Sequence, residues 1–111
     1  MKLLTKQIIK SLPKLRATEK IAIEDKKIIL KFFDPTGSWT WYVVEGESID
    51  NSDDFMFFGL VDGFEREWGY FTLAELRDAK KNVLGVRGLP IERDLWFSPI
   101  LYKDLKSANR W

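Results

Sequence analysis

Apolar and polar residues alternate through the middle of the chain, a pattern typical of β-strands that face a core. The tetrapeptide DPTG at residues 34–37 is a strong turn signal, and Asp62-Gly63 favours a two-residue type I′ hairpin turn. These turns help to separate four strand candidates, at residues 27–33, 39–45, 55–61 and 64–71. The pattern predicts an antiparallel meander of three or four strands.

The strand candidate at residues 39–45 is largely apolar on both of its faces. One face carries Trp39, Trp41 and Val43, and the other carries Thr40, Tyr42 and Val44. A strand of this kind is central in its sheet or covered on both sides. In the last strand candidate, Gly69 predicts a bulge or a close approach of another backbone segment.

Helix signals occur near the N-terminus and after the last strand candidate. Thr5 is an N-cap candidate for a short helix that Pro13 closes. Its apolar face consists of Leu4, Ile8, Ile9 and Leu12. Thr72 and Glu75 match a capping box, in which Glu75 reaches back to the amide of Thr72, and predict a helix to about residue 81.

The C-terminal third is less regular. Residues 82–97 contain two glycines and a proline, so no long element is expected there. The dipeptide SP at 98–99 predicts the start of a terminal helix through about residue 108. That helix faces inward with Leu101, Leu105 and Ala108. Together these elements predict a single α+β domain over residues 1–111, with two or three short helices packed on the meander.

Composition places the chain among ordinary globular proteins, because 45% of its residues are hydrophobic and 32% are charged. Cysteine is absent, which excludes disulfides and thiolate metal sites. No apolar run approaches the roughly 20 residues that a membrane helix needs. Lysines interrupt the N-terminal apolar stretch, unlike the apolar region of a signal peptide. We therefore expect a soluble, cytoplasmic protein without a membrane contact.

Charge is distributed unevenly although the net charge is only +1. Residues 1–31 hold nine Lys/Arg and three Asp/Glu, whereas residues 45–67 hold eight acids and one base. Ten of the sixteen aromatic residues also lie between residues 39 and 71. A basic N-terminal third and an acidic, aromatic middle would steer partners if the fold keeps them apart.

Catalytic chemistry has little support, since histidine and cysteine are both absent. The pairs Glu65/Glu67 and Glu92/Asp94 each have the spacing that puts two carboxylates on one strand face, where they could hold Mg²⁺. Solvated faces and ion pairs explain both pairs more simply. We expect no enzyme activity, catalytic residue, metal site, cofactor or small-molecule substrate. For Glu92, Arg93 and Asp94 we expect a structural ion-pair cluster that ties the irregular segment to the sheet.

Two binding functions remain open. Trp39, Trp41, Phe57 and Tyr70 are candidate stacking platforms for single-stranded nucleic acid, but the acids among them would repel phosphate. A protein partner with a positively charged groove would instead be attracted to the acids. The candidate acidic face consists of Asp50, Asp53, Asp54, Asp62, Glu65 and Glu67. By composition alone, a solvated surface remains the simpler interpretation.

Four strings carry a family resemblance: LLTKQIIKSLPKL from residue 3, SWTWYVVEGE from residue 38, DDFMFFGLVDGFEREWGYFTLAEL from residue 53 and GLPIERDLWFSP from residue 88. They resemble the motifs of a family of small uncharacterised bacterial proteins that occur widely on plasmids, phages and integrated elements. The similarity covers nearly the whole chain. Its departures are mild, since Trp68 stands where the family favours Leu and Trp96 where it favours Tyr.

The resemblance implies no enzymatic activity and no cofactor, because none is established for the family. One such domain has been put forward as an inhibitor of type II RNA-guided CRISPR nucleases, which hold nucleic acid in a positively charged channel. The resemblance therefore implies a non-enzymatic, phage- or mobile-element-encoded inhibitor that binds a type II nuclease. An accessory nucleic-acid-binding protein of plasmid or phage DNA processing is the alternative.

Overall fold

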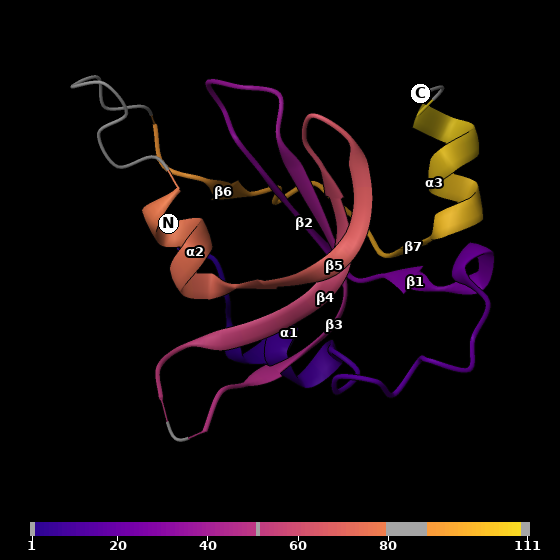
Figure 1. Cartoon of the computed structure of the whole chain (residues 1–111), viewed down its shortest axis with the longest axis horizontal. Coiled ribbons are helices and arrows are strands. Elements are labelled where there is room, and N and C mark those ends of the chain that lie inside the picture. The colour runs from indigo at the N-terminus through magenta and orange to yellow at the C-terminus, as the bar shows by residue number, and fades with distance from the viewer. Residues whose placement is uncertain (1, 51, 80–88, 110–111) are drawn as a thin grey trace.

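The computed structural model describes residues 2–50, 52–79 and 89–109 and has the predicted α+β fold (Figure 1). Five strands form an antiparallel sheet in the order β5-β4-β3-β2-β6. Their bounds are β2 Leu30–Phe33, β3 Thr40–Ser48, β4 Phe55–Asp62, β5 Arg66–Thr72 and β6 Glu92–Arg93. A second sheet pairs β1 (Lys27–Ile28) with β7 (Ile100–Leu101). The predicted meander is thus present and gains β6 as an additional edge strand.

Short helices lie around the five-stranded sheet. They are α1 (Lys6–Ser11), the 3₁₀ turn η1 (Ile23–Asp25), α2 (Leu73–Asp78) and α3 (Tyr102–Asn109). In Figure 1, α2 and α3 lie on opposite sides of the strands, and α1 lies beside the lower part of β3. Within the described residues, no helix is long and apolar enough to cross a membrane.

Strand β3 is covered on both faces, as its sequence predicts. Trp41 and Val43 belong to one core, which contains Leu73 and Leu76 of α2. Tyr42 and Val44 belong to a second core, which contains Leu105 of α3. The sheet therefore separates two cores, which we call the α2 core and the α3 core.

The predicted special glycine is the wrong one. Gly69 has open space around the position of a Cβ, and β5 pairs in regular register with β4 there. The close approach occurs at Gly59, opposite Gly69, where a Cβ would lie 1.8 Å from the carbonyl oxygen of Tyr42. The bulge lies in β3, where the register shifts between Val43 and Glu45. Gly59 is needed because the backbone of Tyr42 and Val43, next to this bulge, occupies the space that a Cβ would take.

The segment predicted as one strand at residues 27–33 divides at Ile29. Ile28 is buried in the α3 core, while Leu30 is buried in the α2 core, although simple alternation would put both on one face. The chain therefore crosses from one side of the sheet to the other at this point. Its first part pairs with β7 and its second part with β3.

Both predicted N-terminal caps are present. The amide of Ile8 donates to Thr5 Oγ1 at 3.2 Å, and the amide of Glu75 donates to Thr72 Oγ1 at 3.1 Å. The return contact of the capping box differs, because Glu75 accepts from the Thr72 hydroxyl at 3.2 Å instead of the amide. Helix α2 ends at Asp78, and the expectation for residues 80–81 lies outside the described residues.

Two predicted boundaries are wrong. The strand predicted to end at residue 45 continues to Ser48, so residues 46–48 pair with β4 and do not belong to the connection between β3 and β4. Gly46 permits this pairing, since a Cβ there would lie 2.6 Å from the ring of Phe55. The β4–β5 hairpin has a three-residue loop and not a two-residue turn, because Asp62 pairs with Arg66.

The C-terminal helix begins later than its SP signal predicts. Residues 98–99 precede β7, which includes Leu101, and α3 starts only at Tyr102. Strand β7 intervenes because its backbone pairs with β1, a partner far away in sequence. Leu105 is buried as predicted, but Ala108 is exposed.

Candidate protein-binding site

The eight acids between residues 45 and 67 fall into three groups in the structure. Glu45 and Glu47 lie on β3. Asp50, Asp53 and Asp54 lie at the connection of β3 to β4, and Asp62, Glu65 and Glu67 lie at the hairpin between β4 and β5. Figure 1 shows these two connections at opposite ends of the long strands.

The two β3 carboxylates anchor the segment that follows α1. Glu47 Oε1 accepts the amide of Leu15 at 2.9 Å, and Glu45 Oε1 accepts the amide of Arg16 at 2.7 Å. Glu45 Oε2 accepts both the amide of Thr18, at 2.9 Å, and its hydroxyl. Arg16 has a φ of 71°, a left-handed conformation that is unfavourable for a residue with a Cβ. The carboxylate contacts hold the backbone in this conformation.

Glu45 is a structural residue that sequence reasoning missed. Its side chain is only 2% exposed, and Lys26, also buried, donates from Nζ to the hydroxyl and carbonyl oxygens of Thr18. Thr18 thereby links a buried cation to a buried carboxylate. The bulge in β3 makes this contact possible, because it turns Glu45 to the same side of the sheet as Val44.

Two of the six predicted contact acids are also engaged within the fold. Asp54 Oδ1 accepts the amides of Phe55 at 2.8 Å and Ala74 at 2.9 Å, so it helps to fix the start of α2. Asp62 lies 3.6 Å from Arg66 Nε in an ion pair across the hairpin. These contacts reduce the charge that either residue offers to a partner.

Four acids are exposed and form no ion pair with the described residues: Asp50, Asp53, Glu65 and Glu67. They do not form one continuous face, because the length of β4 separates the first two from the last two. At the usual rise per residue of a strand this separation is about 23 Å. The predicted acidic face is therefore two sites, which we call the β3–β4 tip (Asp50, Asp53) and the β4–β5 tip (residues 62–67).

The β4–β5 tip combines free carboxylates with an exposed aromatic ring. Phe64 is 95% exposed, and its ring meets that of Trp39 edge-on at 5.5 Å between centroids. Gly63 lies flat against Trp39, where a Cβ would be 2.5 Å from ring atoms. The amide of Gly63 also donates to the carbonyl of Glu65 at 3.0 Å. Packing on Trp39 thus holds the tip in one conformation before any partner binds.

The strand geometry proposed for a metal site is absent at both acid pairs. Glu65 lies in the hairpin loop and only Glu67 lies on β5, while Asp94 follows the end of β6. Asp94 is engaged by Lys31 Nζ at 3.7 Å and by the amide of Trp96 at 2.9 Å. Within the part of the chain that the structure describes, no group of three potential metal ligands occurs.

The region of Glu92, Arg93 and Asp94, predicted as one ion-pair cluster, instead makes separate contacts through Arg93 and Asp94. Among the described residues, Arg93 forms no ion pair with its two acidic neighbours. Its Nη1 donates to the carbonyl oxygens of Lys2, at 2.9 Å, and Leu3, at 3.3 Å. Arg93 therefore ties β6 to the N-terminal segment, and the ion pair of this region joins Asp94 to Lys31 of β2.

A second exposed aromatic residue was not predicted as a site. Trp96 is 94% exposed on a turn that Asp94 closes through its side chain, and the neighbouring Leu95 is also exposed. Phe97 anchors the turn in the protein, with its ring 6.5 Å from that of Tyr42. The sequence carried one signal, the aspartate two residues before Trp96, which is typical of such turns.

The proposed nucleic-acid platforms are mostly unavailable. Trp41 and Phe57 are buried, and Trp39 packs under the β4–β5 tip. Tyr70 is 58% exposed, and its ring lies 5.1 Å from that of Phe58, which contacts Trp68. These three rings, which we call the outer rings, lie on the α3 side of β4 and β5, where Trp68 packs edge-on against Tyr102.

Arg16 and Lys26 line a hollow together with Phe58 and Tyr70, and both bases are engaged within the fold, Lys26 by Thr18. Arg16 Nε donates to Glu19 at 3.1 Å, and this hydrogen bond is the main reason why the pKa of Arg16 is raised. Arg66 pairs with Asp62, and Lys106 pairs with Glu24 at 3.3 Å. Among the described residues, these ion pairs reduce the positive charge that the three rings could combine with for a nucleic-acid backbone.

Comparison with known proteins identifies a family for the chain. No curated protein and no solved structure matches it. A family model described as a protein of unknown function, DUF2958, matches residues 3–103 and so spans all the described strands and the first two residues of α3. The chain belongs to the DUF2958 family.

Proposed function

We propose that this protein is a non-enzymatic inhibitor of a type II RNA-guided nuclease, that is, an anti-CRISPR protein. Phages and other mobile elements that encode such an inhibitor gain protection from the host nuclease. The observation that carries the proposal is the β4–β5 tip, where Phe64, Glu65 and Glu67 project from a preorganised hairpin. The nuclease and its guide complex are the proposed partner.

Charge and shape at the tip suit such a partner. Type II nucleases hold their guide–target duplex in a positively charged channel. Glu65 and Glu67 present free carboxylates to such a surface and would occupy positions otherwise taken by phosphates. Phe64 adds a large apolar anchor, which is the type of residue that dominates many interfaces. Because Trp39 already holds the hairpin, little ordering entropy would be lost on binding.

The β3–β4 tip is a secondary part of the proposed surface. Asp50 and Asp53 are exposed but have no aromatic neighbour comparable to Phe64. A single partner touches both tips only if its own surface extends along β4, for about 23 Å. We therefore assign the main contact to the β4–β5 tip.

A DNA-cleavage assay tests the function directly. The purified protein is titrated into reactions of several guide-loaded type II nucleases, before or after the target DNA is added. We expect dose-dependent loss of cleavage with at least one nuclease and co-purification of the protein with that nuclease complex. Full cleavage with every nuclease, at a large molar excess of the protein, would contradict the proposal.

The alternative is an accessory nucleic-acid-binding protein for plasmid or phage DNA processing. The outer rings of Phe58, Trp68 and Tyr70 favour it, since they form a row on a sheet surface. The paired bases around them weigh against it. Binding of a labelled oligonucleotide that weakens with salt and is lost in Tyr70→Ala would favour this alternative.

A further inference from the structure

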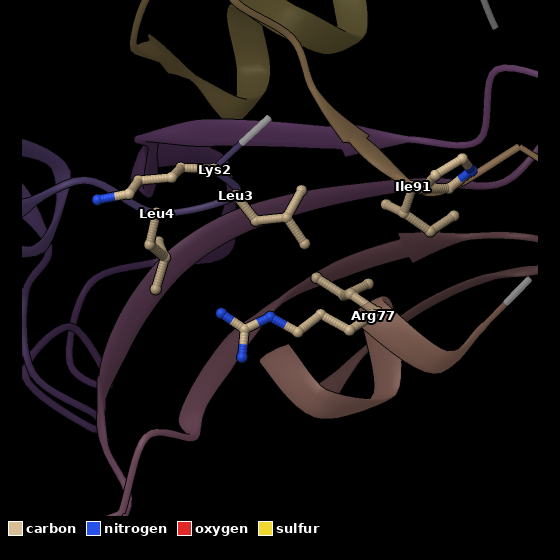
Figure 2. Close-up of a pocket in the computed structure, with 7 residues that line it drawn as sticks. Lys2, Leu3, Leu4, Arg77 and Ile91 are labelled. Atoms are coloured by element: carbon tan, nitrogen blue, oxygen red, sulfur yellow. The ribbon is translucent and has the colours of Figure 1, made fainter.

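A groove lies on the α2 side of the sheet, between α1, the paired ends of β3 and β4, and α2. Its volume is about 700 Å³, which is within the range of ligand-binding clefts. A smaller hollow of about 440 Å³ adjoins it and shares Leu4 and Arg77. Figure 2 shows this hollow, with Arg77 extending from α2 toward the N-terminal segment that carries Leu3 and Leu4.

The groove gathers three cationic side chains. Lys10, Lys14 and Arg77 line it, and none of them forms an ion pair with the described residues. Five other bases do have carboxylate partners, Arg16, Lys31, Arg66, Lys103 and Lys106, whereas Lys20 and Lys27 form no ion pair with the described residues either. The three cations of the groove outnumber the two carboxylates of the lining, Glu47 and Asp53, and Glu47 already accepts the amide of Leu15.

Apolar side chains form the floor and one wall of the groove. Ile9 projects from α1 and is 43% exposed, and Leu4 is half-buried beside it. The edges of Leu12, Phe55 and Leu73 complete the apolar surface. Exposing Ile9 on a short helix has no benefit for folding, since burial of this side chain would stabilise the protein.

We propose that this groove binds an acidic peptide segment of a partner protein, with carboxylates at Lys10, Lys14 and Arg77 and a bulky apolar side chain against Ile9. Nucleic acid fits less well, because the lining has no exposed aromatic ring on which a base could stack. The site is separate from the β4–β5 tip, so it stands whether or not the protein inhibits a nuclease.

Fluorescence anisotropy with a labelled acidic peptide, EDLFEDL, tests the site on the full-length protein at low salt. We expect saturable binding, and weakening by about tenfold or more in K10E/K14E/R77E, because three surface ion pairs are lost together. The control K20E/K27E changes exposed lysines that do not line the groove. Ile9→Gln should also weaken binding, and thermal unfolding of each variant confirms that it is folded.

The remaining outcomes overturn the proposal. They are no saturable binding of the peptide, an equal loss in K20E/K27E, or equal binding of the basic peptide KKLFKKL. Tighter binding at the same residues by a single-stranded oligonucleotide, or by decanoate as a simple anionic amphiphile, would assign the groove to another class of ligand. Salt titration of the wild-type complex separates charge-driven from apolar binding in each case.

Discussion

Glu45 and Glu65 belong to the same acidic stretch of the sequence, and the fold uses them in opposite ways. Glu45 is buried and accepts hydrogen bonds from Arg16 and Thr18. Glu65 lies in an exposed hairpin loop beside Phe64 and has no ion pair among the described residues. A run of acids in a sequence is therefore not a surface. Only contacts with distant segments decide which carboxylates support the fold and which remain available to a partner.

Removing the buried carboxylate should have the largest effect on stability. Glu45→Ala leaves buried Lys26 and the amide of Thr18 without compensation, so we expect the free energy of unfolding to fall by about 3–5 kcal/mol. Urea unfolding measures the change. Glu45→Gln keeps an acceptor oxygen and should cost less. A loss below about 1 kcal/mol in Glu45→Ala would show that the network is not structural.

Removing the Arg93 side chain should have the second-largest effect on stability, because Arg93 joins β6 to the N-terminal segment through two carbonyl oxygens. Arg93→Ala should lower the free energy of unfolding by about 1.5–3 kcal/mol, the usual range for hydrogen bonds to a charged group. The matched comparison is Arg66→Ala, which removes an ion pair at the exposed hairpin and should cost at most about 1 kcal/mol. Equal losses in both variants would contradict the assigned role of Arg93.

Neighbouring aspartates provide a finer comparison at the β3–β4 connection. Asp54→Ala removes the acceptor for the amide of Ala74 at the start of α2 and should cost about 1 kcal/mol. Asp53→Ala removes an exposed carboxylate that forms no ion pair with the described residues and should stay within about 0.5 kcal/mol of wild type. Thermal unfolding of the two variants side by side distinguishes a structural acid from a free one.

The central strand and the helix caps could be predicted because their causes are local. Alternation in residues 39–45 identified both faces of β3, and Thr5 and Thr72 identified the two caps. Each of these signals lies within a few residues of the feature that it predicts.

Contacts between distant segments could not be predicted. Strand β6 has only two residues and exists because it pairs with β2. The three-residue hairpin loop depends on Gly63 lying against Trp39. Burial of Glu45 depends on Thr18 and Lys26, which belong to the basic third of the sequence. The candidate site was incomplete for the same reason, since the separation of its acids follows from the length of β4.

The most direct test compares charge reversal at the β4–β5 tip with the same change elsewhere. The variant E65K/E67K and the control D104K, at an exposed acid that forms no ion pair with the described residues, are measured for binding to a guide-loaded type II nuclease that the wild-type protein inhibits, and for thermal unfolding. The account predicts at least about tenfold weaker binding for E65K/E67K, unchanged binding for the control, and melting temperatures within about 2 °C of wild type. Wild-type affinity in a folded E65K/E67K variant would contradict it.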